Sequence, residues 1–450
     1  MRSLIHCIAL FFTLAVGLVQ PAAAQNRGIG LIRDAEIENI IRDYATPIFN
    51  AAGLDAESVK IHLVGDPRLN AFVAGGQRMF INTGLLIRAE TPEQVIGVIA
   101  HEAGHIAGGH LARVQDELRN AELKSIIAAV VGVAAGLASG DTRVAAGIIG
   151  GGSQAAFADL LKYSRTQESS ADAAGLKYLD SVGLSARGLV EFFGLLQREI
   201  RVTGGREHPY LSSHPLTADR ISAVKAHLAF SRFTNASTPP ALAKQHAFVR
   251  AKLIGFMEPL ETTLEIYGEE DGSIPARYAR AIAYYQRSDL KRSLPLIDSL
   301  ITDDPDNPYF YELKGQMLLE NGRVGESIIP YTRMAELAPG EPLLRTALAK
   351  AQVESGNPAL LEGALSNLLA ASRSEPDMAE SWRLLTIVYG RLGRPGELAL
   401  SQAEYNLLGG DAKAAEALGN RAIDILPVGS PGSIRAQDIV GEAERRLKDK

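Results

Sequence analysis

His101, Glu102 and His105 have the residue types and spacing of a zinc site on a helix. Residues four apart on an α-helix project within about 40° of each other, so both imidazoles can bind one ion. Glu102 lies about 100° round the helix, within reach of a water on that ion. Two histidine ligands and a glutamate general base make up the HExxH arrangement. We therefore predict one Zn²⁺ per chain and metal-assisted hydrolysis.

A catalytic zinc needs a third protein ligand and an open position for water. His110 almost completes the longer pattern HExxHxxGxxH, but it lies one residue too close to His105. On a continuing helix it would lie about 180° from His101 and face away from the metal, so we interpret it as structural.

A second helix offers the better third ligand. Glu168 and Asp172 are four residues apart and would share one helix face. One carboxylate would bind zinc, while the other accepts a hydrogen bond from an imidazole and orients it. The alternative is a solvated helix face on which Arg165 and Asp172 are ordinary surface charges.

Three motifs together resemble the CAAX prenyl protease-like family of zinc metallopeptidases. They are HEAGH at 101–105, ESSAD at 168–172 and SHPLTADRI at 213–221. With an export signal and C-terminal repeats, the chain from about residue 30 to residue 450 is similar to the periplasmic BepA-type proteases of two-membrane bacteria. The resemblance implies a gluzincin-type α+β protease fold in which Glu168 completes the metal site.

The third motif adds His214 and Arg220. The resemblance implies that His214 can occupy the water position and keep the enzyme latent; alternatively it polarises the scissile carbonyl, or it merely precedes Pro215 at a helix start. Arg220 is expected to pair with Asp172 or with substrate. The predicted site is thus catalytic Glu102, His214 and Arg220; metal-binding His101, His105 and Glu168; and, behind them, Asp172.

The metal helix has a strong start signal. Thr91 is a capping residue, Pro92 stands at the first helical position, and Gln94 follows three residues after the cap. These residues predict a helix from Pro92 to about Gly108.

Short elements precede that helix. We predict a helix over Ile32–Phe49, a strand over Lys60–Val64, and a hairpin of Asn70–Ala74 and Gln77–Asn82 joined by the two-residue link Gly75-Gly76. Because the hairpin comes just before the metal helix, its outer strand is placed to hold an extended polypeptide by strand addition.

The N-terminus predicts export. Arg2, an apolar run from Leu4 to Val19 and Ala22-Ala23-Ala24 have the order of a cleaved signal peptide, which implies a periplasmic protein cut near Ala24. An uncleaved anchor is the alternative. Within 125–158 two uncharged stretches are too short to span a membrane, so we predict buried helices there, or helices that cover a cleft or touch a membrane surface.

A period of 34 residues appears after about Pro275: Pro305 recurs at Pro339, and Pro308 at Pro342. This period resembles tetratricopeptide repeats, which stack into a solenoid. We predict a mainly α protein with five segments: a signal peptide (1–24), a zinc metallopeptidase domain (25–240), a linker and helical connection (241–274), tetratricopeptide repeats (275–427) and a C-terminal helix (428–450).

Composition excludes one class of function. The chain has 46 basic and 52 acidic residues, a net charge of −6, and only 6% aromatic residues, which argues against nucleic-acid binding. The remaining prediction is a zinc endopeptidase that hydrolyses misfolded or stalled envelope or outer-membrane proteins, with repeats that recruit clients or assembly machinery. The alternative is an assembly scaffold or chaperone whose protease site is normally shut. No transmembrane span is expected in the mature chain.

Overall fold

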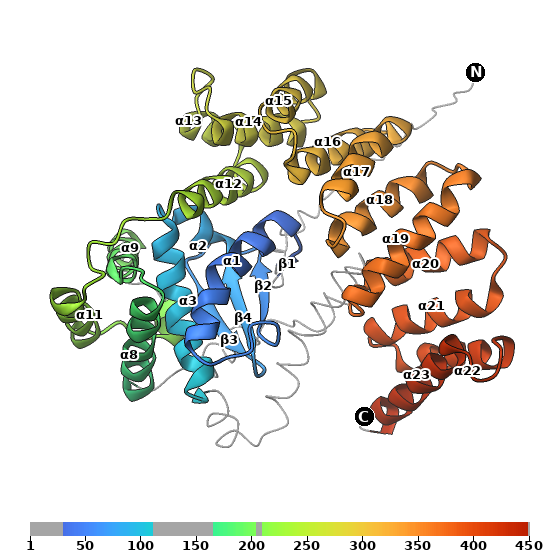
Figure 1. Cartoon of the computed structure of the whole chain (residues 1–450), viewed down its shortest axis with the longest axis horizontal. Helices are drawn as coiled ribbons and strands as arrows, with labels where there is room; N and C mark the ends of the chain where they lie inside the picture. The colour runs from blue at the N-terminus through green and yellow to red at the C-terminus, as the bar shows by residue number, and fades with distance from the viewer. Residues whose placement is uncertain (1–29, 111–164, 204–208, 449–450) are drawn as a thin grey trace, which may run out of the picture.

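The computed structural model of the chain describes residues 30–110, 165–203 and 209–448. The predicted export signal (1–24) and the uncharged stretches within 125–158 lie outside these residues. In the described part, a small sheet with packed helices is followed by a row of helix pairs (Figure 1), which confirms the predicted fold class. No helix in those ranges combines the length and the apolar character needed to cross a membrane.

Four strands form one sheet in the order β1-β2-β4-β3. The pair β2 and β4 is parallel, and β3 and β4 form the predicted antiparallel hairpin, so β3 is an edge strand. The strands are β1 (Leu31–Ile32), β2 (Lys60–Val64), β3 (Ala71–Ala74) and β4 (Arg78–Asn82).

The hairpin loop is one residue longer than predicted. Ala74 pairs with Arg78, which leaves Gly75, Gly76 and Gln77 in the turn. Gly75 and Gly76 have φ angles of 58° and 92°. Glycine adopts such angles without a steric penalty, so these two residues make the tight reversal possible.

Helices surround the sheet. The first, α1, begins at Ala35 rather than at Ile32, because the Asp34 side chain caps it by accepting a hydrogen bond from the Ile37 N–H at 2.9 Å. The helices of this half are α1 (Ala35–Ala51), α2 (Thr83–Arg88), α3 (Pro92–Ala107), α8 (Arg165–Ser181), α9 (Arg187–Thr203), α10 (Pro209–Ser213) and α11 (Ala218–Phe230).

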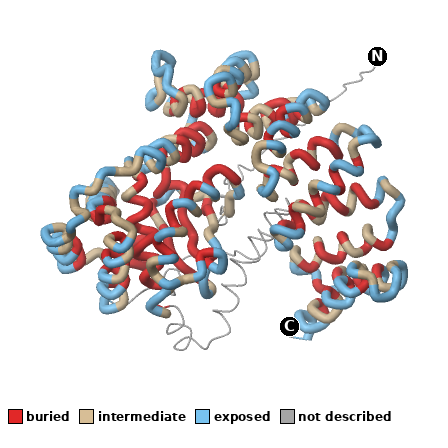
Figure 2. The backbone as a smooth tube through the Cα atoms, viewed as in Figure 1, coloured by how far each residue is buried: buried red, intermediate tan, exposed pale blue. Residues whose placement is uncertain are grey.

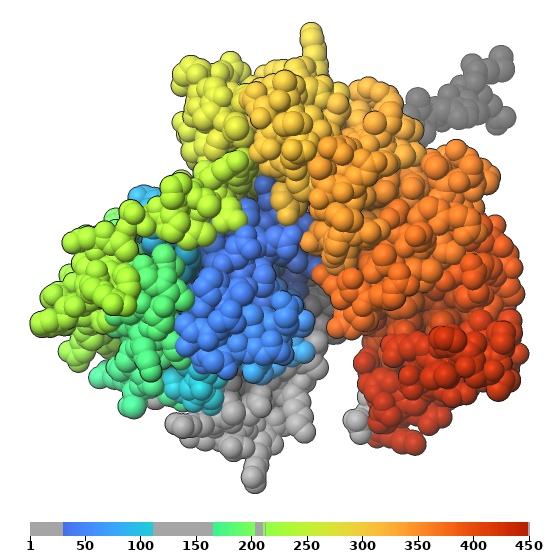
Figure 3. Space-filling model, in the orientation of Figure 1, coloured from blue at the N-terminus to red at the C-terminus, as the bar shows by residue number. Residues whose placement is uncertain are grey.

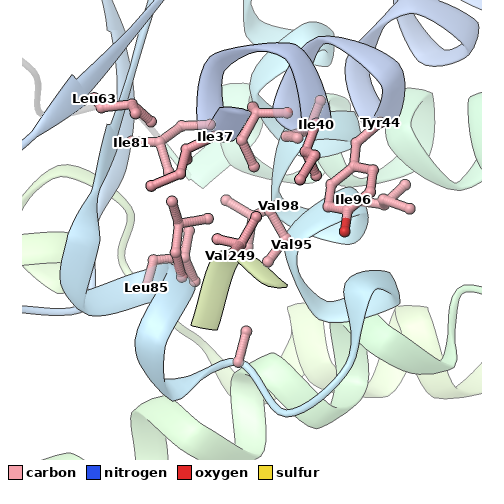
Figure 4. Packing of buried hydrophobic residues seen from close by; sticks show 14 of the residues in the cluster. Ile37, Ile40, Tyr44, Leu63, Ile81, Leu85, Val95, Ile96, Val98 and Val249 are labelled. Atoms are coloured by element: carbon pink, nitrogen blue, oxygen red, sulfur yellow. The ribbon is translucent and has the colours of Figure 1, made fainter. Parts of the chain in front are cut away.

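A hydrophobic core lies between α1, the sheet and α3. Figure 4 shows Ile37 and Tyr44 of α1, Ile81 of β4 and Val98 of α3 directed toward one another, with Val249 beneath them. All five side chains are buried. This packing fixes α3, the helix that carries the HExxH residues, against the sheet.

The start of α3 is as predicted, but the cap is different. Thr91 precedes Pro92, yet its side chain forms no capping hydrogen bond. Instead, the side chain of Gln94 accepts a hydrogen bond from the backbone N–H of Glu90 at 3.0 Å. In a capping box the side chain of Gln94 would accept from the backbone N–H of Thr91; here it accepts from the residue before Thr91.

Two glycines let α3 and α8 approach closely. A Cβ on Gly104 would lie 2.7 Å from the carbonyl oxygen of Ala171, and a Cβ on Gly175 would lie 3.1 Å from the backbone of Ala100. Larger residues would push the helices apart at both points. The close approach brings the carboxylates of α8 beside the histidines of α3.

The C-terminal half contains only helices among its described residues. Two helices, α12 and α13, occupy the segment predicted as a linker and helical connection; eight of the 18 residues of α12 are buried, so this connection packs against the rest of the chain (Figure 2). The elements are α12 (Pro240–Met257), α13 (Leu260–Ile266), α14 (Ile274–Gln286), α15 (Leu290–Asp303), α16 (Pro308–Glu320), α17 (Val324–Leu337), α18 (Pro342–Glu354), the 3₁₀ turn η1 (Pro358–Leu360), α19 (Leu361–Ser374), α20 (Ala379–Arg391), α21 (Pro395–Leu408), α22 (Ala412–Ile425) and α23 (Pro431–Lys448).

Polar contacts join the two halves. Lys252 of α12 is buried and lies 2.8 Å from Asp34, 3.2 Å from Glu36 and 3.6 Å from Glu312 of α16. The hydroxyl of Tyr278 donates to Glu36 at 2.8 Å. Figure 3 shows the repeats descending along one side of the molecule beside the N-terminal half. The beginning of α1 therefore takes part in positioning the repeats.

Candidate metal centre

Three of the predicted site residues lie on α3. His101, Glu102 and His105 are fully buried. His101 and His105 are one turn apart, and their Nε2 atoms lie 3.1 Å from each other. Two imidazole nitrogens that face each other so closely present two lone pairs to one point in space.

Glu168, on α8, lies beside both histidines. Its Oε1 atom is 3.2 Å from Nε2 of His105, and its Oε2 atom is 3.6 Å from Nε2 of His101. The carboxylate is fully buried. The helix pair thus places a carboxylate against the two imidazoles, as the four-residue spacing on each helix predicts.

His214 follows α10 and reaches the same point. Its Nδ1 atom lies 3.0 Å from Oε1 of Glu168 and 3.4 Å from Nε2 of His101. Its Nε2 atom lies 3.4 Å from Oε1 of Glu102. The imidazole of His214 therefore stands between the cluster of ligand atoms and the carboxylate of Glu102.

The four side chains have the geometry of a metal site. One ligand atom from each of His101, His105, Glu168 and His214 lies within 4.8 Å of the others. Ligands bonded at about 2.0–2.1 Å to a tetrahedral zinc lie roughly 3.3–3.4 Å apart. The separations given above range from 3.0 to 3.6 Å. Nitrogen and carboxylate ligands at this spacing fit zinc or a similar divalent ion.

Burial and neighbouring charges put two of these groups in metal-binding form. Burial lowers the pKa of His105 well below its usual value, so its imidazole is neutral. Burial alone would raise the pKa of Glu168, but the nearby histidines outweigh it and hold that pKa well below the usual range. Neutral imidazole and ionised carboxylate are the forms that bind metals.

Glu102 has a different environment. Burial raises the pKa of its carboxyl. Neither of its carboxylate oxygens accepts a hydrogen bond from the residues that the structure describes. A carboxylate with a raised pKa and free lone pairs is suited to take up a proton.

A second layer of polar residues holds the histidines and Glu168. Nδ1 of His101 lies 2.8 Å from Oδ1 of Asp172. Arg220 of α11 donates to both oxygens of Asp172, and its Nη1 atom lies 2.5 Å from Oε2 of Glu168. We predicted Arg220 as catalytic, with Asp172 or substrate as its partner; its contacts here are with the two carboxylates of α8.

The prediction that His110 faces away from the site is wrong. Helix α3 ends at Ala107, and Gly109 has a φ of 62°, so the chain turns back. His110 is buried, and its Nδ1 atom lies 2.9 Å from Nδ1 of His105. His110 therefore contacts His105, which belongs to the group of ligand atoms, but His110 does not belong to that group. The two consecutive glycines after the helix were the signal for this turn.

Tyr210, which the sequence patterns did not single out, lies next to His214 and outside the group of ligand atoms. Its ring is fully buried, and its centroid lies 4.8 Å from that of His214 at an interplanar angle of 32°. The signal was the four-residue spacing between Tyr210 and His214. By contrast, His62, His227 and His246 lie apart from the cluster, and His208 is outside the described residues.

Comparison with known proteins gives matches to both halves. Residues 31–228 match the model of peptidase family M48, and residues 278–342 match a tetratricopeptide repeat model. The beta-barrel assembly-enhancing protease of Escherichia coli K12 is 22% identical over 412 residues, which cover 89% of this chain and 81% of that protein. A putative beta-barrel assembly-enhancing protease of Vibrio cholerae is 22% identical over 418 residues, covering 88% of this chain and 82% of the relative. The E. coli metalloprotease YcaL is 32% identical over 171 residues, or 38% of this chain and 61% of YcaL.

Proposed function

Because this chain is a metallopeptidase with an M48 domain followed by tetratricopeptide repeats, we propose that it is a zinc-dependent endopeptidase of the bacterial cell envelope. Its substrates in this proposal are misfolded or stalled outer-membrane proteins in the periplasm, where a cleaved signal peptide would deliver it. The observation that carries the proposal is the buried group of four ligand atoms beside Glu102. The names of the relatives support the substrate class.

In this proposal His101, His105 and Glu168 hold the zinc ion. When bound, zinc supplies Lewis acidity that activates a water and polarises a peptide carbonyl. Glu102 takes the proton of the attacking water and delivers it to the leaving amine. Asp172 accepts a hydrogen bond from Nδ1 of His101 and so keeps Nε2 directed to the metal.

His214 stands where a water would have to bind. It touches Glu168 through one ring nitrogen and Glu102 through the other, so it separates the metal ligands from the general base. We infer from these contacts that the protease is latent in this arrangement and that His214 moves before water and substrate bind. If His214 instead assists catalysis, it would polarise the carbonyl of the scissile bond from a nearby position.

An extended substrate has a docking edge next to this centre. The strand β3 pairs with β4 on one side, and no other described strand pairs with its opposite edge. It contacts both α3, which carries Glu102, and α10, which precedes His214. A polypeptide added along β3 would present its backbone beside the metal ligands.

The repeats supply the second part of the proposal. A solenoid of helix pairs offers a surface for a client or for the outer-membrane assembly machinery, and tethering raises the local concentration of a client at the protease. The matching relatives are named for enhancing β-barrel assembly as well as for proteolysis. This favours, as a second candidate, an assembly scaffold whose protease is normally shut.

Glu102→Gln distinguishes the two candidates, because glutamine preserves size but does not take up a proton. We expect E102Q to keep its zinc and to lose hydrolysis of an unfolded protein by at least ~100-fold, both alone and combined with H214A. Hydrolysis that persists in E102Q would refute the proposed mechanism. If E102Q restores outer-membrane protein assembly in cells that lack the protein, the scaffold function accounts for that phenotype.

A further inference from the structure

We propose that Tyr210 is a positioning residue that holds the imidazole of His214 among the metal ligands. This inference rests on the proposed role of His214 at the metal, and it adds the residue that determines how firmly His214 stays there. Tyr210 itself touches none of the ligand atoms of α3 or α8 in the contacts described above. It acts through His214.

The rings of Tyr210 and His214 are in contact. Their centroids are 4.8 Å apart, and their planes are inclined by 32°. The backbone N–H of His214 also donates to the carbonyl oxygen of Tyr210 at 2.7 Å, so one turn of chain joins the two residues. The His214 ring thus contacts the ring of Tyr210 as well as the rings of His101 and His105, both of which have centroids 5.2 Å away.

Tyr210 is in turn fixed by the hydrophobic core. Its side chain is fully buried and belongs to the main cluster of apolar residues. The ring of Phe192, on α9, meets it edge to face at a centroid distance of 5.2 Å. A ring held in this way leaves His214 little room to swing back from the ligand cluster.

The aromatic ring, and not the hydroxyl, makes these contacts. The buried hydroxyl of Tyr210 has no hydrogen-bond partner among the residues that the structure describes. Removing the hydroxyl therefore costs no interaction, whereas removing the ring opens space beside His214. Substitution of Tyr210 by phenylalanine therefore tests the hydroxyl, and substitution by leucine tests the aromatic ring.

The test compares hydrolysis of unfolded casein by the zinc-loaded full chain and its variants Y210F, Y210L, H214A and Y210L/H214A. We expect Y210F to match the wild type, and Y210L to change the basal rate several-fold in the same direction as H214A, upward for a latent enzyme. The double variant should match H214A, because Tyr210 has no effect once His214 is absent. The inference would be overturned if Y210L hydrolysed casein at the wild-type rate. It would also be overturned if Y210L changed the rate as much in the H214A variant as in the wild type.

A spectroscopic measurement keeps the inference testable if Y210L is unstable. Cobalt can replace zinc and reports its coordination in the visible spectrum; Y210M, whose flexible side chain can partly fill the space left by the ring, should shift this spectrum toward that of H214A. An unshifted spectrum would overturn the inference. Leu179→Ala is the control, because Leu179 is buried in the same core and has no ring that could stack on His214. If H214A lowers the rate of hydrolysis, the proposal that His214 keeps the enzyme latent is wrong. The inference about Tyr210 still holds in that case if Y210L lowers the rate as well.

Discussion

Arg220 donates two hydrogen bonds to the carboxylate of Asp172, at 2.6 and 2.9 Å. Asp172 in turn lies 2.8 Å from Nδ1 of His101, and all three side chains are buried. Burial alone would raise the pKa of Asp172, but the hydrogen bonds from Arg220 and His101 lower it to about 2. The ionised carboxylate keeps a proton on Nδ1 of His101 and leaves the Nε2 lone pair for a metal.

We expect Asp172→Asn to weaken zinc binding by about 10- to 100-fold, because the amide has a similar shape but lacks the charge that fixes the imidazole. Competition with a chelator of known affinity measures this change. Asp180→Asn is the matched control: Asp180 lies on the same helix but contacts His227 and Ser231 outside the site. Equal zinc affinity in D172N and D180N would contradict the role given to Asp172.

His110 gives a second prediction about the layer behind the ligands. Because His110 contacts Nδ1 of His105 and does not join the ligand cluster, we expect H110A to weaken zinc binding by about tenfold and still to bind one ion. The same chelator competition measures the affinity, with His227→Ala as the control. Complete loss of zinc in H110A would show that His110 is itself a ligand.

The contact between the two halves predicts a pH dependence of stability. Burial raises the pKa of Glu312 to about 7, although the charge of Lys252 opposes the shift, and Asp34 and Glu36 reinforce it. Since the unfolded value is about 4.3, the folded chain binds more protons between these two pH values. The stabilising contribution of protonated Glu312 is thus complete below about pH 4 and is lost as the pH rises through 7.

Glu312→Gln removes this titration, because glutamine resembles the protonated acid. We expect the melting temperature of the wild type to fall more steeply than that of E312Q between about pH 4.5 and pH 7 in a thermal-unfolding series, because only in this range does the folded chain bind more protons than the unfolded chain. Glu326→Gln, at an exposed site on α17, should keep the wild-type slope. If the melting temperatures of E312Q and the wild type change with pH at the same rate, the pKa of Glu312 is not raised in the folded chain.

Much of the fold and of the candidate site followed from local sequence patterns. The four-residue spacings His101–His105 and Glu168–Asp172 determine which side chains share a helix face, and the 34-residue period reports the stacking of helix pairs. Such patterns depend on neighbours in the chain. The structure brings together the residues that they selected, and their individual roles remain proposals.

The features that local patterns missed depend on turns or on distant contacts. His110 was misplaced because its direction was worked out for a continuing helix, whereas α3 ends at Ala107 and Gly109 has a φ of 62°. Lys252 contacts Asp34 and Glu312, which are far from it in the sequence. Periodic spacing identifies residues that are close together in the sequence, so it does not predict such pairs. Only packing in three dimensions reveals them.

The zinc content of the purified chain shows whether Glu168 is a ligand and whether Glu102 is not. The experiment is to measure zinc per chain by mass spectrometry in the wild type, E168A and E102Q, each purified without added chelator. We expect about one zinc in the wild type and in E102Q, and a large loss in E168A, because Glu168 is proposed as a ligand and Glu102 as a base. Full zinc occupancy in E168A, or a wild-type chain that binds no zinc when the metal is supplied, would contradict it.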